Sequence, residues 1–446
     1  MANWWHKAYW NAFTLWHVRH ERSLPYRPLE EIKALQNRRI RTIVAHAYET
    51  VSYYREVMDE SGLHPDDFRT ADDLARLPFL SGDQLARDPE RYLSSRYANG
   101  RSLRLHSSGT SGRLRKINYD ARALFLALAH GYRQRLVLAH FTGRTFGYRE
   151  AVLSRPGSIG SHIRNFYESY SWTPRTVDLT RDDISPGDSF AVNIARLDQF
   201  KPEVLSGYGS YLGLLFRRAW EQKLPIFRPK VIYYGGDRMA DADRLLLENE
   251  FRVPVYSSYQ AGETLRLAFQ CERREGFHLS LDHVAVRVVD KGGKPVGPGE
   301  TGEIVISNLT NWATVLLNYK LGDIVTVGDT PCPCGRTLPT IARIDGRADD
   351  LIALPEGQRI HSLVVLPSLH RVPGVIQVKL IQEDLQQFSL QVVCVGTVDW
   401  PRTCQELQSA LRSVLGLTLT VSITRVDAVA PEPGGKVRAV ISHCRS

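Results

Sequence analysis

The stretch VIYYGGDRMADADRLLLENEFRVPVYSSYQAGE, residues 231–263, places a β-rich run, a helical pattern and a second β-rich run in succession. Its middle part, residues 241–251, has apolar residues at helical spacing, whereas both ends are rich in Val, Ile and Tyr. The same alternation extends outward, with a helix predicted over residues 121–140 and strands predicted over residues 283–290 and 302–309. Strands that alternate with helices indicate layered α/β structure.

The two ends of the chain follow other patterns. Residues 1 to about 100 are predicted to be mostly helical. The last hundred residues are predicted to contain strands at 375–382, 388–395 and 419–426 around a helix at 403–416. With 446 residues, two or three domains are expected. The fold class predicted is α/β, with a large multi-layer N-terminal domain over residues 1–348 and a small α+β C-terminal domain over residues 349–446.

Composition limits the classes of function. The chain has a net charge of +9 and 43% hydrophobic residues, values typical of an ordinary globular protein. The positive charge is dispersed, so a nucleic-acid partner is not expected. No run is long and apolar enough for a membrane span, and residues 1–24 do not form a signal peptide. We therefore expect a cytoplasmic protein.

Four of the eight tryptophans lie in the first sixteen residues. Trp5, Tyr9, Phe13 and Trp16 recur at helical spacing. A helix packed on the body of the protein is favoured over a helix that binds a partner or a membrane surface.

Six cysteines in a chain of this length do not form a disulfide scaffold. Cys271, Cys332 and Cys334 are grouped in one part of the chain, and His278 lies in the same part. Three thiolates and one imidazole suit a structural zinc ion. The alternative is a set of buried free cysteines beside a surface histidine, and the spacing alone does not decide between them.

Residues 107–116, SSGTSGRLRK, combine hydroxyls, glycines and cations. Such a mixture suits an anion, and a polyphosphate in particular, because glycine lets the backbone approach a ligand closely. Two residues separate Gly109 from Gly112, where a Walker loop requires four, so this is no ordinary nucleotide-hydrolase loop. A flexible connector is the alternative.

Other polar residues follow apolar runs. Gly235 and Gly236 end one run and would let the backbone approach a flat ligand. Asp323 follows a glycine, where a carboxylate can accept from two ribose hydroxyls or simply form a turn. Arg347 precedes the expected domain boundary, and Lys436 lies in a Pro- and Gly-rich stretch typical of a loop.

Six motifs occur in an order that resembles the adenylate-forming superfamily and its phenylacetate-CoA ligase and coenzyme F390 synthetase-like (CapK-like) branch. They are SSGTSGRLRK, YYGGDRM, YSSYQAGE, NYKLGD, GRADD and GGKVRAV. The resemblance covers residues 25 to 446 and implies a two-step reaction. A carboxylic acid, expected to be an aryl or other planar acid, attacks the α-phosphate of ATP, and a thiol such as coenzyme A then captures the acyl adenylate.

The resemblance also implies roles for individual residues. The phosphate loop would consist of Ser107, Ser108, Gly109, Thr110, Ser111 and Gly112, with Arg115 or Lys116 adding charge. Other nucleotide contacts would come from Gly235, Gly236, Asp237, Tyr256, Tyr259, Asp323, Arg347 and Arg359. Tyr208, Tyr234 and Ser258 would line the acyl pocket. Asp349 would act as the hinge of the mobile C-terminal domain, and Lys436 as the catalytic cation. Because members of the branch carry a similar set of residues, the resemblance also favours zinc at Cys271, His278, Cys332 and Cys334.

The sequence departs from the family motif Y-G-x-T-E, which here reads Tyr256-Ser-Ser-Tyr259-Gln260. The residue that holds Mg²⁺ becomes a neutral amide, and Glu263 would replace it if the segment turns helically. The acceptor stays open between coenzyme A, a carrier protein and an amine, and a homodimer is possible. A protein that binds a nucleotide or acyl group without catalysis is the alternative from another class, and a zinc-containing nucleic-acid binder is a weaker one.

Overall fold

The computed structural model describes residues 3–100, 102–108, 114–155, 157–172, 180–348, 351–355, 359–395, 398–416, 419–429 and 439–444. The chain divides into two compact units. The larger comprises Met1–Ala219, Pro225–Leu321 and Val325–Arg343, and the smaller comprises Trp220–Leu224, Gly322–Ile324 and Ile344–Ser446. Asp349 lies outside the described residues, so the expected boundary and hinge there stay predictions.

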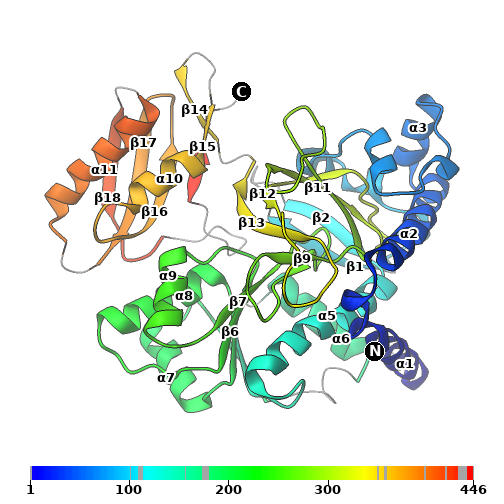
Figure 1. The fold of residues 1–446 in the computed structure, drawn as a ribbon, viewed down its shortest axis with the longest axis horizontal. Coiled ribbons are helices and arrows are strands. Elements are labelled where there is room, and N and C mark those ends of the chain that lie inside the picture. Colours follow the sequence, from blue (N-terminus) through cyan, green and yellow to red (C-terminus); the bar gives the residue numbers. More distant parts are fainter. Residues whose placement is uncertain are drawn as a thin grey trace. The chain divides into compact units, whose positions relative to one another are not determined.

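The first hundred residues are mostly helical, as predicted (Figure 1). The α-helices are α1 (Trp4–Glu21), α2 (Leu29–Thr50), α3 (Ser52–Glu60) and α4 (Gly82–Arg87). Short 3-10 helices connect them at Leu24–Tyr26, Pro65–Asp67, Asp72–Arg76, Pro89–Tyr92 and Ser95–Tyr97. Within the described parts, no helix is long and apolar enough to cross a lipid bilayer.

A two-stranded hairpin follows, made of β1 (Leu103–Ser108) and β2 (Leu114–Tyr119). The strands are antiparallel and pair from Leu103 opposite Tyr119 to Ser108 opposite Leu114. Ser108 and Leu114, which flank segment 109–113 in the sequence, are therefore paired. That segment lies outside the described residues.

The body of the larger unit is an eleven-stranded sheet in the order β10-β11-β12-β13-β9-β8-β7-β6-β5-β3-β4. Its parallel strands are β3 (Glu150–Leu153), β4 (Arg181–Ile184), β5 (Val204–Gly207), β6 (Val231–Gly235) and β7 (Val255–Tyr259). The other strands are β8 (Ala268–Phe269), β9 (Phe277–Leu279), β10 (Val284–Val289), β11 (Thr301–Asn308), β12 (Tyr319–Val327) and β13 (Thr340–Arg347). The helices of this part are α5 (Ala121–Thr142), α6 (Ile159–Tyr170), α7 (Phe190–Phe200), α8 (Gly209–Glu221) and α9 (Asp241–Asn249).

Strand β6, helix α9 and strand β7 form the predicted strand-helix-strand unit. An apolar core packs α8 and α9 on the parallel strands through residues such as Leu212, Phe216, Ile232, Leu247 and Val255. In parallel strands the carboxyl ends lie at one edge of the sheet, where α/β proteins bind ligands. Gly235 and Tyr259 therefore end their strands at the same edge.

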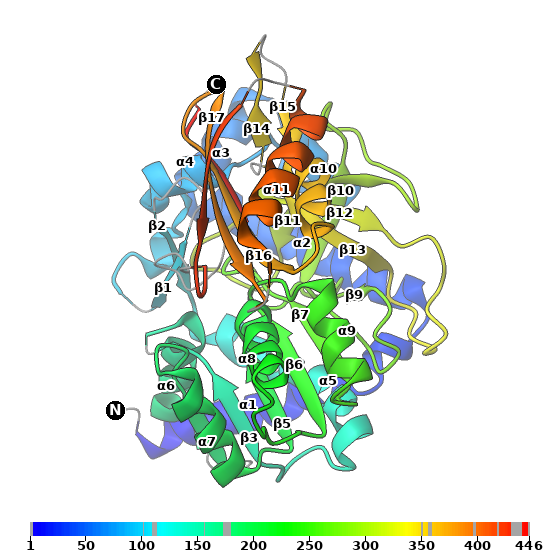
Figure 2. The same cartoon turned by 90° about the vertical axis from the view of Figure 1, so that its left-hand side faces the viewer.

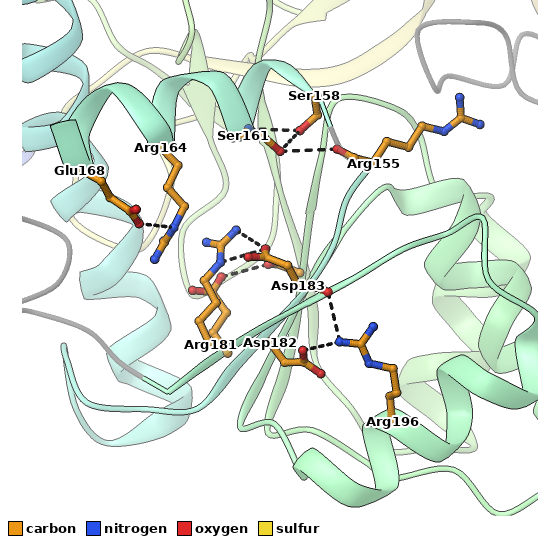
Figure 3. Close-up of polar contacts among 11 residues, drawn as sticks. Arg155, Ser158, Ser161, Arg164, Glu168, Arg181, Asp182, Asp183 and Arg196 are labelled. Atoms are coloured by element: carbon orange, nitrogen blue, oxygen red, sulfur yellow. Dashed lines mark hydrogen bonds and ion pairs between the residues drawn. The ribbon is translucent and has the colours of Figure 1, made fainter. Parts of the chain in front are cut away.

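Charged residues occupy the outermost strand, β4, as Figure 3 shows. Asp183 accepts a hydrogen bond of 2.7 Å from Arg181, and Asp182 pairs with Arg196 of α7. Charges on an edge strand discourage pairing with a further strand. These charges therefore disfavour pairing of β4 with a strand of another molecule.

The smaller unit has the predicted α+β structure (Figure 2). Its four-stranded sheet has the order β18-β17-β16-β19, formed by β16 (Val375–Gln382), β17 (Gln387–Cys394), β18 (Thr420–Arg425) and β19 (Val440–Ser442). The hairpin β14 (Leu351–Ala353) and β15 (Arg359–His361) precedes it, and α10 (Ser362–His370) and α11 (Trp400–Leu415) supply its helices. Leu407 and Leu411 of α11 pack against Val378, Leu380 and Leu390 of the sheet.

Candidate functional site

The predicted phosphate loop lies at the tip of the β1-β2 hairpin. Ser107 and Ser108 are the last residues of β1, whereas Gly109, Thr110, Ser111 and Gly112 lie outside the described residues. The register pairs Ser107 with Arg115 across the hairpin. The phosphate role of this segment stays a prediction.

Arg115 lies in a buried ion pair instead of facing solvent. Its side chain donates a hydrogen bond of 3.2 Å to Glu263, and the same carboxylate oxygen accepts one of 3.2 Å from the Tyr319 hydroxyl. A Cβ at Gly82 would lie 2.2 Å from the Arg115 guanidinium, so only glycine leaves room for this side chain. Of the two cations offered for phosphate, Lys116 is the exposed one.

Glu263 is 4% exposed, and Arg115 neutralises its charge. The Glu263 carboxylate thereby links three parts of the chain: β2, the segment that follows β7, and strand β12. Nothing in the sequence pattern indicated Arg115 as its partner, because the two residues are 148 positions apart. The magnesium role predicted for Glu263 remains a prediction, and this pairing competes with it.

The substituted motif forms a compact hydrogen-bond network at the end of β7. The Gln260 amide donates to the Tyr233 hydroxyl at 2.6 Å and to the Ser258 hydroxyl at 2.7 Å. Tyr233 and Ser258 are themselves 2.6 Å apart, and burial raises the pKa of Tyr233. Gln260 therefore has a defined position, in which its amide group donates to both hydroxyls.

Other predicted residues lie around the same strand ends. Gly236 has φ of 86°, a conformation that favours glycine. The Asp237 carboxylate accepts from the Gly209 backbone at 2.6 Å, so it holds the beginning of α8. Tyr234 packs on Gly209, where a Cβ would lie 2.6 Å from its ring. Tyr208 is half-buried beside Gly236.

The two tyrosines of β7, Tyr256 and Tyr259, are both buried. Tyr256 is fully buried beside Tyr233 and Phe141, and burial raises the pKa of its hydroxyl. Its side chain is thus part of the core, so a nucleotide contact by this residue would have to come from its backbone. Tyr259 is 6% exposed at the end of the strand.

Asp323 and Arg347 are brought together, as the predicted ribose clamp requires. Arg347 donates a hydrogen bond of 2.7 Å to the Asp323 carboxylate, from the neighbouring strands β13 and β12. Gly322 has φ of 82°, and a Cβ there would lie 3.0 Å from the Arg347 guanidinium. Close approach and positive φ both explain glycine before Asp323. Lys436 and the side chain of Arg359 lie outside the described residues.

The cysteines and histidine predicted as metal ligands converge. Ligand atoms of Cys271, His278, Cys332 and Cys334 all lie within 4.8 Å of one another. The sulfurs of Cys271 and Cys332 are 3.7 Å apart, and Cys334 Sγ is 3.4 Å from His278 Nε2. Tetrahedral zinc with bonds of about 2.3 Å to sulfur and 2.0 Å to nitrogen would separate its ligand atoms by about 3.5 to 3.8 Å. The arrangement fits zinc.

The surroundings of the cluster act differently on the pKa values of its members: burial raises the pKa of Cys271 and of Cys332. Burial lowers the pKa of His278 to about 4, which keeps the imidazole neutral, and its Nδ1 lies 3.4 Å from the Leu338 carbonyl oxygen. Because Nδ1 makes that contact, Nε2 is the ring nitrogen that faces the thiols, as in many zinc sites. Burial works to raise the pKa of Cys334, but hydrogen bonds from Arg336 lower it overall.

The chain is similar in sequence to known proteins over most of its length. The CapK C-terminal domain family matches residues 352–443. A phenylacetate-coenzyme A ligase of Thermus thermophilus is 26% identical over 93% of this chain and 97% of its own. Protein CapK of Staphylococcus aureus is 21% identical over 94% of this chain and 91% of its own.

A solved structure shows the fold. That of 2-hydroxyisobutyryl-CoA ligase with a bound acyl adenylate has a TM-score of 0.73 at 19% identity, covering 94% of this chain and 90% of the other. The expected architecture, a large α/β body with a small α+β unit, is thereby confirmed.

Proposed function

We propose that the chain is a member of the phenylacetate-CoA ligase-like and CapK-like branch of the adenylate-forming superfamily, from its similarity to proteins of that branch, and that it converts a carboxylic acid to its coenzyme A thioester. In the first step a carboxylate oxygen attacks the α-phosphorus of ATP, and pyrophosphate leaves. In the second step the thiol sulfur attacks the acyl carbon, its proton is lost, and AMP leaves. The observation that carries the proposal is the similarity to a phenylacetate-coenzyme A ligase over 93% of this chain.

The residues of this chain supply positioning and charge. Asp323 would accept from the ribose hydroxyls, with Arg347 fixing the carboxylate by their 2.7 Å hydrogen bond. Lys436 would offset charge on the α-phosphate, and the hydroxyls and amides of residues 107–112 would bind the outer phosphates. Positioning of this kind accounts for much of the rate in phosphoryl chemistry.

We propose an aryl or other planar acid as substrate. Tyr208, Tyr234 and Ser258 lie at or near the carboxyl ends of β5, β6 and β7. Aromatic walls suit a planar ligand. Transfer to a carrier protein or an amine would use the same adenylate, and the homodimer and the cytoplasmic location also stay predictions.

Magnesium would be held mainly by the phosphates of ATP, with few ligands from the protein. Gln260 is a weaker ligand than a carboxylate, and Glu263 is paired with Arg115. Mg²⁺ is commonly held through substrate phosphates with few protein ligands. Glu263→Gln tests this directly: a shift of the magnesium concentration for half-maximal activity would assign Glu263 as a ligand, whereas lower thermal stability with unchanged magnesium dependence would assign it to the ion pair alone.

The test of the reaction is acid-dependent pyrophosphate release from ATP, with a panel of aryl, aliphatic and amino acids. We expect release with an aryl acid, loss of at least about a hundredfold in Lys436→Ala, consistent with removal of one charge-stabilising group, and thioester formation when coenzyme A is added. Discharge by an amine or a carrier protein but not by coenzyme A would change the acceptor. Nucleotide binding without release, across a broad panel, would favour the protein that binds without catalysis.

A further inference from the structure

Helix α1 has one face that packs on the protein and one that does not. On the inner face, Trp10 stacks on Phe125 of α5 at 4.5 Å, and Thr14 and Glu21 are buried. On the outer face large apolar side chains are 59% to 75% exposed: Trp4, Trp5, Tyr9, Leu15 and Trp16. The expected packing helix is thus present, but most of its predicted aromatic stripe points outward.

The charges of α1 have one sign on this outer face. Glu21 is the single acidic residue of the helix, and it is buried in an ion pair of 2.6 Å with Arg133. Arg19, His20 and Arg22 are exposed at the C-terminal end of the helix, where the aromatic stripe ends. The Arg19 guanidinium lies 5.7 Å from the centre of the Trp16 ring, so cation and aromatic side chains form one surface.

A cationic cavity adjoins the end of the helix. It has a volume of about 650 Å³ and is lined by Arg19, Arg22, His140 and Arg336, among others. Its acidic lining residue, Glu272, is neutralised by Arg336 at 2.9 Å. The remaining positive charge of Arg19 and Arg22 suits an anionic group such as a phosphate.

We propose that the outer face of α1 binds the surface of an anionic lipid bilayer, with the helix lying parallel to it. Trp and Tyr favour the boundary between lipid headgroups and hydrocarbon, and neighbouring Arg side chains favour anionic headgroups. A second copy of the same face would offer Arg19 and Arg22 no carboxylate, because the single acidic residue of the helix is buried in its pair with Arg133. A bilayer supplies both an apolar layer and negative charge.

Sedimentation with lipid vesicles tests the proposal on the whole protein. We expect binding to phosphatidylcholine vesicles containing phosphatidylglycerol, little binding to phosphatidylcholine alone, and weakening by salt. Trp5→Ser/Trp16→Ser should weaken binding at least about tenfold, because it removes the apolar anchors. Arg19→Gln/Arg22→Gln should weaken it by about the same factor and remove most of the salt dependence.

The matched control is Val192→Ser/Leu245→Ser, which removes two apolar side chains that are 48% and 57% exposed on α7 and α9. This variant should bind vesicles as the unchanged protein does, and all variants should melt at nearly the same temperature. Equal binding of neutral and anionic vesicles, or unchanged binding of the tryptophan variant, overturns the proposal. A dimer that the tryptophan variant dissociates, without vesicle binding, assigns the face to a second copy instead.

Discussion

Two polar clusters of the larger unit, one partly and one fully buried, meet the same first criterion for a metal site but differ in how their charge is balanced. Both Cys271-His278-Cys332-Cys334 and Glu21-His130-His283 place possible ligand atoms within 4.8 Å of one another. In the first, three sulfurs and a neutral imidazole converge. The second, with Asp282 and Arg133 beside it, contains its own cation.

Arg133 decides the nature of the second cluster. Its guanidinium makes two hydrogen bonds to Asp282, of 3.0 and 2.8 Å, and pairs with Glu21 at 2.6 Å. The rings of His130 and His283 are stacked at 4.3 Å with an angle of 17°, so their lone pairs lie in two nearly parallel planes and are poorly placed to meet at one point. Closeness of the ligand atoms is therefore not enough to identify a metal site. The lone pairs must also point to one position, and no side-chain cation may already balance the charge of the ligands.

Removal of two of the cysteines predicted to bind zinc should have the largest effect. For Cys332→Ser/Cys334→Ser we expect loss of bound zinc and destabilisation on the order of 5 kcal/mol, because metal binding and folding are coupled. Metal analysis and thermal unfolding measure the two effects. Cys404→Ser in α11 provides the control, since this cysteine lies outside the cluster. A purified protein without zinc, whose double variant melts at the same temperature, would remove the metal site and with it the contrast.

Replacement of Arg133, the cation of the second cluster, should cause the next largest loss of folding stability. Arg133→Met would leave Asp282, which is 1% exposed, without its bidentate partner. Loss of one member of a buried ion pair costs about 3–5 kcal/mol. Denaturant unfolding measures this cost. Arg144→Met is the control, because Arg144 is 52% exposed in its pair with Glu203 and such pairs contribute about 1 kcal/mol or less.

If Arg133→Met instead bound a stoichiometric divalent metal at unchanged stability, the guanidinium would have been occupying a metal position. The two clusters would then differ only in their occupant. Equilibrium dialysis with zinc separates this result from simple destabilisation.

The sequence predicted local structure and one cluster well, for physical reasons. Hydrophobic periodicity is local, so the strand-helix-strand unit at 231–259 and the α+β unit could be recognised directly. The grouping of the three cysteines with His278 was favoured by the resemblance, because their spacing alone left free cysteines as an alternative. The pairing of Asp323 with Arg347 followed from a resemblance, not from their spacing.

Long-range ion pairs could not be predicted. Arg115 and Glu263, or Arg133 and Asp282, are about 150 positions apart, and charged residues are common enough that their sequence positions do not identify partners. The outward stripe of α1 was missed because helical spacing shows that aromatic residues share a face, but not which way that face points.

The second cluster should also make stability depend on pH. Burial lowers the pKa of His283 to about 3 and that of His130 well below its usual 6.5, so both are neutral in the folded protein. The unfolded chain takes up protons below about pH 6.5. The contribution of each histidine to folding stability is therefore complete above that pH and is lost as the pH falls toward 4, by about 1.4 kcal/mol per pH unit. Glu21 acts in the opposite direction, because burial raises its pKa to about 7 and the folded protein then takes up a proton that the unfolded chain does not. Denaturant unfolding between pH 7 and 5 should show a smaller slope for His130→Leu, by about that amount. An unchanged slope would mean that His130 is not held neutral, and would contradict the view of this cluster as a charge-balanced part of the core.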